Sequence, residues 1–458
     1  MRLDTSTNPR RLFGTSGIRG IVGQELSTDF CCEVAKTIAT SLPLHARVCL
    51  ATDTRQSREL VKNAVTSGLL SAGINVVDLG ILPTPALALL TREMGFDTGI
   101  MITASHNPPE FNGIKLFNGD SSGYSQAQEA EIEEIYLGKK FTKGRTGNLT
   151  HLYDGKQRYL SFIKGKFPAP QSNHLKVVVD PGNGAASHFA SDILGQMGFN
   201  IIPLNDEPDG LFPGRSPEPK EDTLLGTVEF LRQQDADLAV CFDGDADRVV
   251  FCDREGFLGF DEPIALISRA IIQETGKKKV AATVETGKLL DLAIKDLGGE
   301  VIRGKVGDVN VAYLARELDA ALGVEPVGVY IIPKMGYYSD SMVATLILLS
   351  QIKGAGEIRQ FFQHIHKPFF EKSKIPCPDE LKNLVMTRLQ ERAYLFGAKE
   401  INNLDGLKLE FDDSWMLIRA SGTEPAIRVI AESMSKSQAG KLMKKGTEFV
   451  QSLMEVSR

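Results

Sequence analysis

The chain has 458 residues, of which 42% are hydrophobic and 24% charged, the composition of a globular protein with about three or four domains. Its net charge of −6 offers no basic surface for nucleic acid or an anionic membrane, and we expect neither as a partner. The chain begins Met1-Arg2-Leu3 with no apolar leader and has no membrane-length apolar run, so we expect a cytoplasmic protein.

Short apolar runs that end on polar or glycine residues recur along the chain. Runs of this kind are typical of strands buried on both faces of layered α/β domains, with helical segments such as 57–72 between them. Ligands collect at the carboxyl ends of such strands, so the polar residues there are candidate sites. The runs cover residues 48–51, 100–102, 177–179, 238–242 and 280–284.

The C-terminal part has a different pattern. A helix around 384–396 precedes three short strands and a closing helix that starts near Ser435, which indicates an α+β domain with an antiparallel sheet. We therefore predict three similar α/β domains, with mixed, Rossmann-like layered sheets, and one C-terminal α+β domain. Breaks in the pattern near 164–173, 253–256 and 372–379 place the domains at residues 1–154, 155–254, 255–370 and 371–458.

Ser105 stands on a turn directly after the apolar run 100–102, and Asn107-Pro108 forces that turn. A hydroxyl at the tip of a rigid element, beside the imidazole of His106, is a candidate for covalent catalysis. Lys115 follows soon after. It would serve as an acid or base if it were buried near charge, although a surface lysine is the commoner reading.

Asp243, Asp245 and Asp247 follow another apolar run at a spacing of two residues. If the chain bends at Gly244, these carboxylates can converge on a hard cation such as Mg²⁺. An EF-hand is excluded, because Arg248 and Arg254 stand where its glycine and its final glutamate belong. The alternative is a solvated acidic loop.

Two arginine-containing segments suit anions. In 419–428, two arginines flank hydroxyls and a glycine between two predicted strands, a combination that suits a phosphate, although a hairpin turn with surface charges is the alternative. Segment 11–20 carries Arg19 and lacks the P-loop pattern, so it is either an anion-binding arm or a flexible loop. Residues 182–187 imitate a dinucleotide motif, but Ser187 occupies its last position, and we predict a tight strand-to-helix turn.

Together these motifs resemble the α-D-phosphohexomutase family, in order and over essentially the whole chain. They are FGTSGIRG at 13–20, TASHNP at 103–108, NGIK at 112–115, DGDADR at 243–248 and RASGTEPAIR at 419–428. The resemblance implies four domains around a central cleft. It also implies an enzyme that moves a phosphoryl group between C6 and C1 of a sugar phosphate, through a phosphoserine and a sugar bisphosphate.

The resemblance also implies roles for single residues. Ser105 would carry the phosphoryl group and, with the three aspartates, bind one Mg²⁺ per subunit. Arg19, Arg248 and His106 would lie at the reaction centre, and Lys115 would be the general acid or base. The sugar would face Gly307, Asp308 and Glu325, and its other phosphate would be held by Arg419, Ser421, Gly422, Thr423 and Arg428. A monomer or homodimer is expected.

The sugar itself is less well defined. The segment Val306-Gly307-Asp308 and the SGTEP motif are most similar to those of phosphoglucosamine mutases. Phosphomannomutases and phosphoglucomutases are the alternatives. Family members commonly have Gly-Glu-x-Ser-Gly, often followed by His, at the sugar loop. This chain keeps Glu325 but has Val327 and Val329 at the Ser and His positions, and Asp340-Ser341 where Asp-Gly is common. These departures raise two further hypotheses, an altered substrate and a non-catalytic paralogue.

Overall fold

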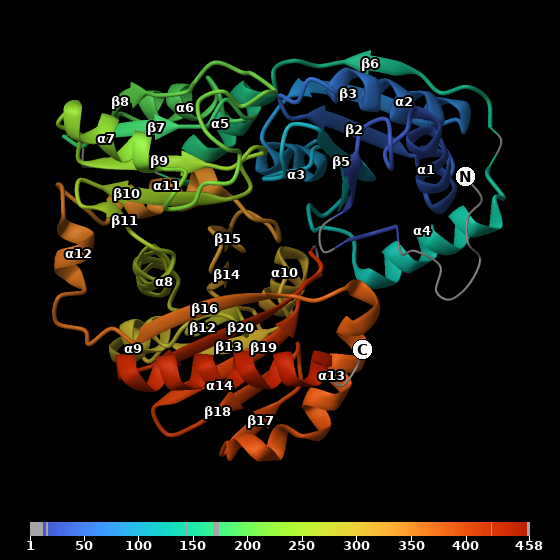
Figure 1. The fold of residues 1–458 in the computed structure, drawn as a ribbon. Coiled ribbons are helices and arrows are strands. Elements are labelled where there is room, and N and C mark those ends of the chain that lie inside the picture. The colour runs from blue at the N-terminus through green and yellow to red at the C-terminus, as the bar shows by residue number, and fades with distance from the viewer. Residues whose placement is uncertain (1–11, 15–16, 143, 168–173, 423, 456–458) are drawn as a thin grey trace.

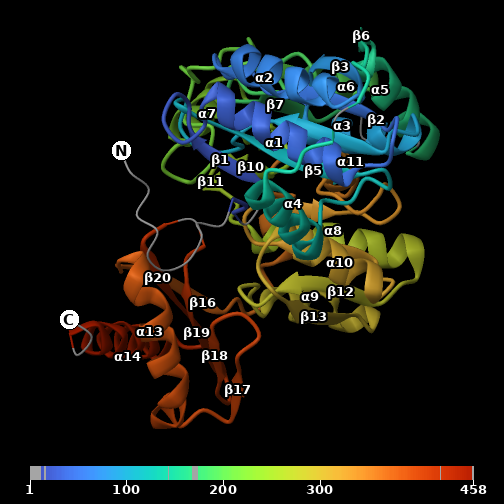
Figure 2. The same cartoon turned by 90° about the vertical axis from the view of Figure 1, so that its right-hand side faces the viewer.

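The computed structural model describes residues 12–14, 17–142, 144–167, 174–422 and 424–455. They form four β-sheets. In Figures 1 and 2 the C-terminal sheet and its helices lie beside the elements of the third sheet and away from the first sheet. The predicted fold class, three α/β domains followed by a C-terminal domain of a different kind, is confirmed.

The first sheet has the strand order β1-β5-β4-β2-β3-β6. Its strands are β1 (Ile18–Ile21), β2 (Arg47–Thr52), β3 (Asn75–Ile81), β4 (Thr98–Ile102), β5 (Phe111–Asn118) and β6 (Leu149–His151). Its helices are α1 (Thr28–Ser41), α2 (Arg58–Ser71), α3 (Thr84–Glu93) and α4 (Gln126–Gly138).

The second and third sheets have the orders β11-β10-β9-β7-β8 and β13-β12-β14-β15. The second is built from α5 (Gly155–Lys166), β7 (Lys176–Asp180), α6 (Ala190–Gln196), β8 (Asn200–Pro203), α7 (Leu225–Gln233), β9 (Leu238–Phe242), β10 (Val249–Asp253) and β11 (Gly256–Phe257). The third is built from α8 (Asp261–Thr275), β12 (Lys279–Thr283), α9 (Leu289–Ile294), β13 (Glu300–Gly304), α10 (Asp308–Glu317), β14 (Leu322–Glu325), β15 (Val329–Ile331), α11 (Ser341–Ser350) and α12 (Glu357–Phe361).

The first three sheets repeat one arrangement of four strands. In each, a central strand (β2, β7 or β12) pairs in parallel with two neighbours, and one neighbour (β4, β9 or β14) pairs with an antiparallel strand. The sequence showed only similar patterns in these regions, whereas the sheets show a structural repeat. Ser105, Asp243 and Glu325 all lie at the carboxyl ends of the equivalent strands β4, β9 and β14.

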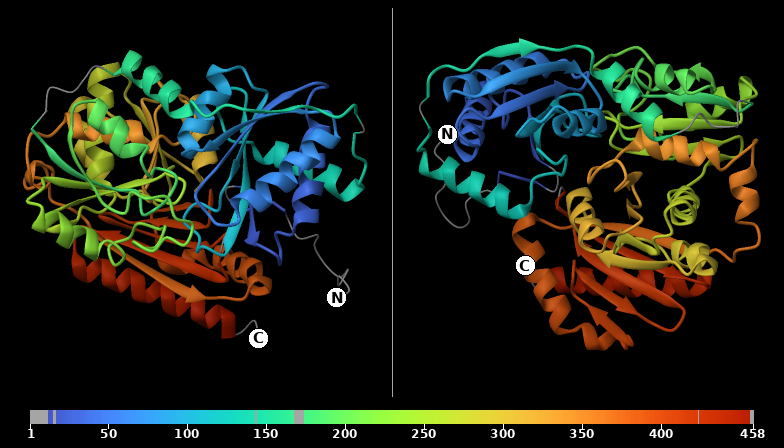
Figure 3. Two further views of the ribbon diagram at one scale, coloured as in Figure 1. Left: turned by 90° about the horizontal axis from the view of Figure 1, so that it is seen from above. Right: turned by 180° about the vertical axis from the view of Figure 1, so that it is seen from behind.

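The unalternating apolar runs are explained by helices on both faces of a sheet. In β2, Val48 and Leu50 belong to one apolar cluster with residues of α1 and α2, and Cys49 and Ala51 belong to another with α3. The two views in Figure 3 show helices on both sides of the first sheet. Successive side chains of a strand point to opposite faces, so both must be apolar.

The fourth sheet is antiparallel, in the order β16-β20-β19-β18-β17. The three predicted strands and the closing helix are confirmed, and two further strands were missed. The elements are β16 (Phe369–Pro376), α13 (Asp379–Glu391), β17 (Glu400–Asn402), β18 (Leu407–Glu410), β19 (Ser414–Ala420), β20 (Ala426–Ser433) and α14 (Lys436–Glu455). Among the described helices, none combines the length and apolarity that a membrane span requires.

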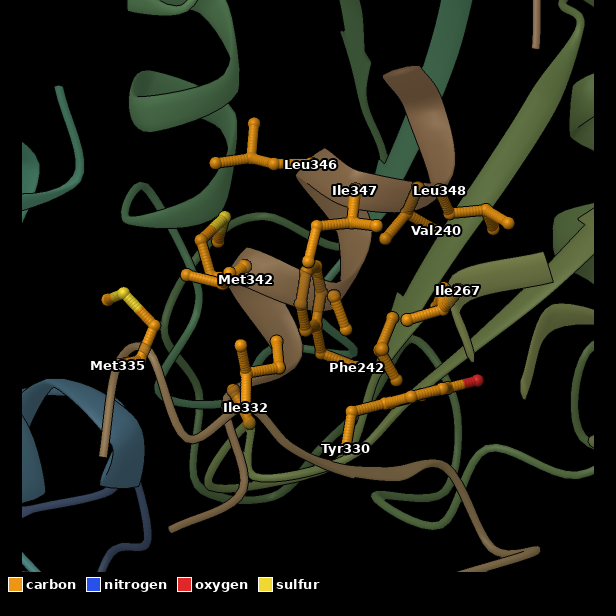
Figure 4. Packing of buried hydrophobic residues seen from close by; sticks show 14 of the residues in the cluster. Val240, Phe242, Ile267, Tyr330, Ile332, Met335, Met342, Leu346, Ile347 and Leu348 are labelled. Atoms are coloured by element: carbon orange, nitrogen blue, oxygen red, sulfur yellow. The ribbon is translucent and has the colours of Figure 1, made fainter. Parts of the chain in front are cut away.

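The three α/β domains share one large apolar core. A single cluster of buried side chains includes Met101 of the first sheet, Val240 of the second and Leu322 of the third. Figure 4 shows part of it, where side chains of β9, α8 and α11 point toward one another. Each of these domains also has a smaller apolar cluster of its own, so the shared core adds to separate ones.

Two predicted domain boundaries fall inside secondary structure. The break near 253–256 is the turn between the paired strands β10 and β11, so the second sheet continues past residue 254. The break near 372–379 is largely β16, which pairs with β20 from Phe369 to Pro376. Because β16 is an edge strand, a proline at its end costs no ladder hydrogen bond. The exact boundaries stay a prediction.

Candidate active site

Ser105 lies on a strained turn at the end of the fully buried strand β4. Its backbone has φ of 52°, in the left-handed region that a serine rarely adopts. Its amide donates to Thr103 Oγ1 at 2.8 Å, and its hydroxyl donates to Asp243 Oδ2 at 2.7 Å. The predicted neighbour His106 has its Nδ1 3.3 Å from the Ser105 hydroxyl.

Arg55 holds this turn, although no sequence motif marked it as a site residue. Its fully buried side chain donates to the carbonyls of Ser105 at 2.9 Å and Asn107 at 2.6 Å, and also to those of Pro108 and Phe111. Asp53 balances the charge of Arg55 with an Nε–Oδ2 distance of 3.0 Å. The only available signal was position, because Asp53 directly follows the apolar run that became β2.

The aspartate loop, residues 243–248, brings three buried carboxylates together. One oxygen from each of Asp243, Asp245 and Asp247 lies within 4.8 Å of the others. Asp245 Oδ1 and Asp247 Oδ1 are buried without a hydrogen-bond partner. A solvated acidic loop is thereby excluded, and oxygens of this kind suit a hard cation. The donor set therefore fits a magnesium ion.

Gly244 is needed because the aspartate loop passes close to the Ser105 turn. A Cβ atom on Gly244 would lie 2.4 Å from the Ser105 carbonyl oxygen, which is too close for any side chain. The bend predicted at Gly244 is a tight approach between two loops, and the left-handed residue of the loop is Ala246, with φ of 56°.

Lys115 lies inside the aspartate cluster. Its Nζ is 2.7 Å from Asp245 Oδ2 and 2.6 Å from Asp247 Oδ2. Burial alone would lower the pKa of Lys115, but the two carboxylates raise it above its usual value. Burial would likewise raise the pKa of Asp245, but Lys115 lowers it below its usual range. Burial raises the pKa of Asp243, with Asp247 and Asp245 adding to the rise.

Arg19 and Arg248 face the same centre. The Nε of each is buried and has no hydrogen-bond partner, and Arg19 otherwise donates to Asn107 Oδ1 at 2.9 Å. Burial lowers the pKa of Arg19, and the nearby Arg248 lowers it further. Burial and the same two arginines lower the pKa of His106, so its imidazole is neutral at neutral pH. Two guanidinium groups near an unmodified serine suit an anion such as a phosphoryl group.

The third domain contributes an acidic wall, which we define as Glu285, Asp308 and Glu325. The amide of Gly307, at the start of α10, donates to Glu325 Oε1 at 3.1 Å. Burial raises the pKa of Glu325 to about 7; Arg248 opposes this rise, and Asp308 and Glu285 add to it. Glu325 therefore lies within electrostatic reach of Asp308, Glu285 and Arg248.

The two valines of the sugar loop belong to the apolar interior of the third domain. Val329 is 1% exposed and lies in a cluster with Val311 and Ala312 of α10, and the half-buried Val327 packs against that cluster. Val329 is thus a core side chain, and its difference from histidine does not by itself remove a ligand from the cleft.

The predicted phosphate loop lies at the turn between β19 and β20. Arg419 and Arg428 are directly paired across these strands. Arg419 NH2 lies 2.8 Å from Glu285 Oε1, and Arg428 NH2 lies 3.3 Å from Glu424 Oε2. Ser421 is buried and Gly422 is exposed, whereas Thr423 is outside the described residues.

The predicted site residues thus form one line across the domains. The Ser105 turn meets the aspartate loop, Arg248 lies near the acidic wall, and Glu285 of that wall binds Arg419 of the fourth domain. A pocket between the first and third domains is lined by Lys115, Asp247 and Asp308, among others. The arrangement has three buried aspartates, Lys115 and two arginines at one end, and the paired strands that carry Arg419 and Arg428 at the other.

Known protein families match this chain over most of its length. Models of the four phosphoglucomutase/phosphomannomutase domains match in order: α/β/α domain I at residues 10–143, domain II at 157–256, domain III at 260–368 and the C-terminal domain at 374–447.

Curated relatives match over almost the full length. A "probable phosphoglucosamine mutase" of Methanopyrus kandleri is 38% identical, over 98% of this chain and 99% of that protein. A "phosphoglucomutase/phosphomannomutase" of Thermococcus kodakarensis is 36% identical, over 97% and 99%. A solved phosphoglucomutase/phosphomannomutase family protein from Burkholderia thailandensis shares the fold, with a TM-score of 0.87, 24% identity and 98% of each chain covered.

Proposed function

Because this chain belongs to the phosphoglucomutase/phosphomannomutase family of α-D-phosphohexomutases, we propose that it is a mutase for glucosamine phosphate. It would move a phosphoryl group between O6 and O1 through a bound sugar bisphosphate. The observation that carries the choice of sugar is the acidic wall, in which Glu325 accepts the Gly307 amide and lies near Asp308, while Glu285 is paired with Arg419. Glucosamine carries an ammonium group at C2, and carboxylates are complementary to it.

In the proposed reaction, Ser105 Oγ carries the phosphoryl group in the active enzyme. The Nε–H groups of Arg19 and Arg248, neither of which makes a hydrogen bond with the described residues, would hold its oxygens. A sugar hydroxyl attacks phosphorus, the bond from phosphorus to Ser105 Oγ breaks, and the hydroxyl proton passes to a base. The released bisphosphate turns over in the cleft and returns its other phosphate to Ser105. Such a transfer depends mainly on positioning and on stabilising charge.

Asp243, Asp245 and Asp247, with an oxygen of the phosphorylated Ser105, would hold Mg²⁺. When bound, the cation would offset the charge of the transferring phosphoryl group and the field that raises the pKa of Lys115. Lys115 is then the residue placed to exchange the proton of the sugar hydroxyl. The neutral His106, 3.3 Å from Ser105 Oγ, contributes a hydrogen-bonding group at the same centre.

The arginine loop of the fourth domain would hold the phosphate that is not being transferred. Arg419, Ser421, Gly422 and Arg428 lie together at one turn, and we propose Thr423 as a further ligand from its place in the sequence motif. Glu285 holds one edge of the Arg419 guanidinium through Nε and NH2. This leaves the NH1 side for a phosphate oxygen.

A second candidate is a mutase for glucose or mannose phosphates, as the name of the Thermococcus kodakarensis relative suggests. A neutral hydroxyl at C2 gains little from the acidic wall. The two candidates therefore differ in how much of kcat/KM depends on a charged group at C2.

A substrate panel tests the proposal. We expect the kcat/KM for glucosamine 6-phosphate to exceed those for the glucose, mannose and N-acetylglucosamine 6-phosphates by about 10-fold or more, the value of one charge-assisted hydrogen bond. Equal or greater efficiency with glucose or mannose phosphate would favour the second candidate. Binding of sugar phosphates without any 1,6-migration would indicate the non-catalytic paralogue.

A further inference from the structure

Every backbone carbonyl of the aspartate loop, and that of the residue before it, accepts a hydrogen bond. Within the second domain, Arg215 donates to Phe242 O at 2.7 Å and the Ala185 amide donates to Gly244 O at 2.9 Å. Two more bonds stay inside the loop, from Ala246 to Asp243 O and from Asp243 to Arg248 O. The remaining carbonyls, of Asp245, Ala246 and Asp247, are bound from other domains.

The first domain supplies Thr84. Its amide donates to Asp245 O at 2.9 Å, and its hydroxyl donates to Asp245 Oδ2 at 2.6 Å. The backbone and the carboxylate of Asp245 are therefore fixed by the same residue at the start of α3.

The third domain supplies two serine hydroxyls. Ser341 Oγ donates to Ala246 O at 2.6 Å, and Ser339 Oγ donates to Asp247 O at 2.5 Å. Ser339 is oriented by the Tyr330 amide, which donates to its hydroxyl at 3.1 Å. Both serines are at least 95% buried, so water does not compete for these bonds.

The part of the loop bound by the serines is the strained part. Ala246 has a φ of 56°, a conformation that costs energy for a residue with a side chain. It also separates Asp245 and Asp247, whose buried Oδ1 atoms accept no hydrogen bond from the described part of the chain. The serines come from the start of α11, which is packed in the shared core and capped by Asp340, the acceptor for the Val343 amide at 3.1 Å.

We propose that Ser341 and Ser339 are positioning residues for the metal site: they hold the backbone of Ala246 and Asp247 in the conformation in which the aspartates converge. The inference rests on the magnesium site proposed above. The serines touch neither the substrate nor the cation, and they act through the loop. The third domain would thereby contribute to metal affinity as well as to sugar recognition.

Metal titration tests this directly. The probe is Mn²⁺, followed by electron paramagnetic resonance, with Mg²⁺ as competitor, on full-length protein matched for Ser105 phosphorylation by intact mass. We expect Ser341→Ala and Ser339→Ala each to raise the Kd for Mn²⁺ by about 10-fold, as for other residues that orient metal ligands. This readout is metal affinity, so it does not depend on any measurement of catalytic activity.

Ser268→Ala is the matched control. Ser268 is also fully buried, and its hydroxyl donates to a carbonyl, that of Ile264 at 2.7 Å within α8. It should lower thermal stability without changing the Kd for Mn²⁺. An unchanged Kd for Mn²⁺ in both test variants, or an equal change in the control, overturns the inference. If Ser341→Ala does not fold, the Kd of Ser339→Ala decides the test. A wild-type protein that binds no Mn²⁺ refutes the metal site itself.

Discussion

Three loops follow the equivalent strands β4, β9 and β14. The loops after β4 and β9 are held in one way, and the loop after β14 is held in another. Arg55 and Arg215 are buried arginines that bind the carbonyls of Ser105 and Phe242 from inside the same domain. In the third domain, Glu325 receives one amide bond from Gly307. The neighbouring acid Glu285 is paired with Arg419 of the fourth domain.

This difference separates two tasks. The proposed phosphoryl transfer needs fixed geometry, and each of its two loops is anchored by a buried ion pair of its own domain, Asp53 with Arg55 and Asp180 with Arg215. The aspartate loop is held in addition by Thr84, Ser339 and Ser341 of the two neighbouring domains. The proposed recognition of the sugar and its phosphate involves acids of the third domain, one of which, Glu285, is neutralised by Arg419 of the fourth domain. Variants in the loops after β4 and β9 should therefore reduce kcat. Variants in the loop after β14 should change KM and its pH dependence.

Ser105→Ala should have the largest effect. It removes the only proposed phosphoryl carrier, so turnover on every sugar phosphate should fall by about 10⁴-fold or more, as for other covalent nucleophiles. Initial rates and intact mass would check this, since the variant should also lack the added phosphate. Ser187→Ala is a control, because its hydroxyl has no partner in the described structure. Retained turnover would disprove the serine mechanism.

Arg55→Met tests the local support of the Ser105 turn. It removes bonds to four carbonyls and leaves the buried Asp53 unpaired, so the free energy of unfolding should fall by about 3–5 kcal/mol. The displaced serine should also lower kcat by about 100-fold. Denaturant unfolding and steady-state kinetics measure the two effects. Arg58→Met, on the partly exposed side of α2, should change neither, and a normal kcat in Arg55→Met would show that the turn holds itself.

Glu325→Gln tests the recognition loop. The pKa of Glu325 is raised to about 7, so the carboxylate that attracts an ammonium group forms only as the pH rises through about 7. The kcat/KM of the wild type for glucosamine 6-phosphate should rise through that pH and fall again as the amine, with a pKa of about 8, loses its proton. In Glu325→Gln the rise should be absent and kcat/KM about 10-fold lower at the optimum. An unchanged pH profile would exclude Glu325 from sugar binding.

Val329→Thr should have the smallest effect. It places a hydroxyl in the apolar cluster with Val311 and Ala312, which costs about 1–3 kcal/mol of unfolding free energy and leaves sugar selectivity unchanged. Val327→Thr, at a half-buried position, should cost less than about 1 kcal/mol. Thermal unfolding and the substrate panel separate the outcomes. A change in sugar preference with Val329→Thr would show that this side chain reaches the cleft after all.

The sequence was sufficient to locate those features whose residues lie close together in the chain. The aspartates of DGDADR, the buried runs and the Ser105 turn are local patterns, and each was located correctly. Arg55, Thr84, Ser339 and Ser341 were missed because their role lies in contacts with residues that are distant in the chain, up to 161 positions away for Thr84 and Asp245. A pattern of single residues contains no information about such pairs.

The orientation of Val329 also could not be predicted from the sequence, because it depends on the register of the β14–β15 hairpin, in which Val329 pairs with Glu325. The predicted break near 372–379 shows a related limit: Pro376 and Pro378 indicated an interruption, but Pro376 ends the edge strand β16, where a missing amide is harmless. In both places a tertiary arrangement decided what a residue type alone left open.

The core shared by the three α/β domains has a consequence for their independence. The three sheets repeat one strand order, and each domain keeps an apolar cluster of its own. Here the facing surfaces are apolar and merged, as between β9, α8 and α11. Separating one domain from the other two would expose this apolar surface to water, so we expect an isolated domain to be less stable than the same domain within the chain.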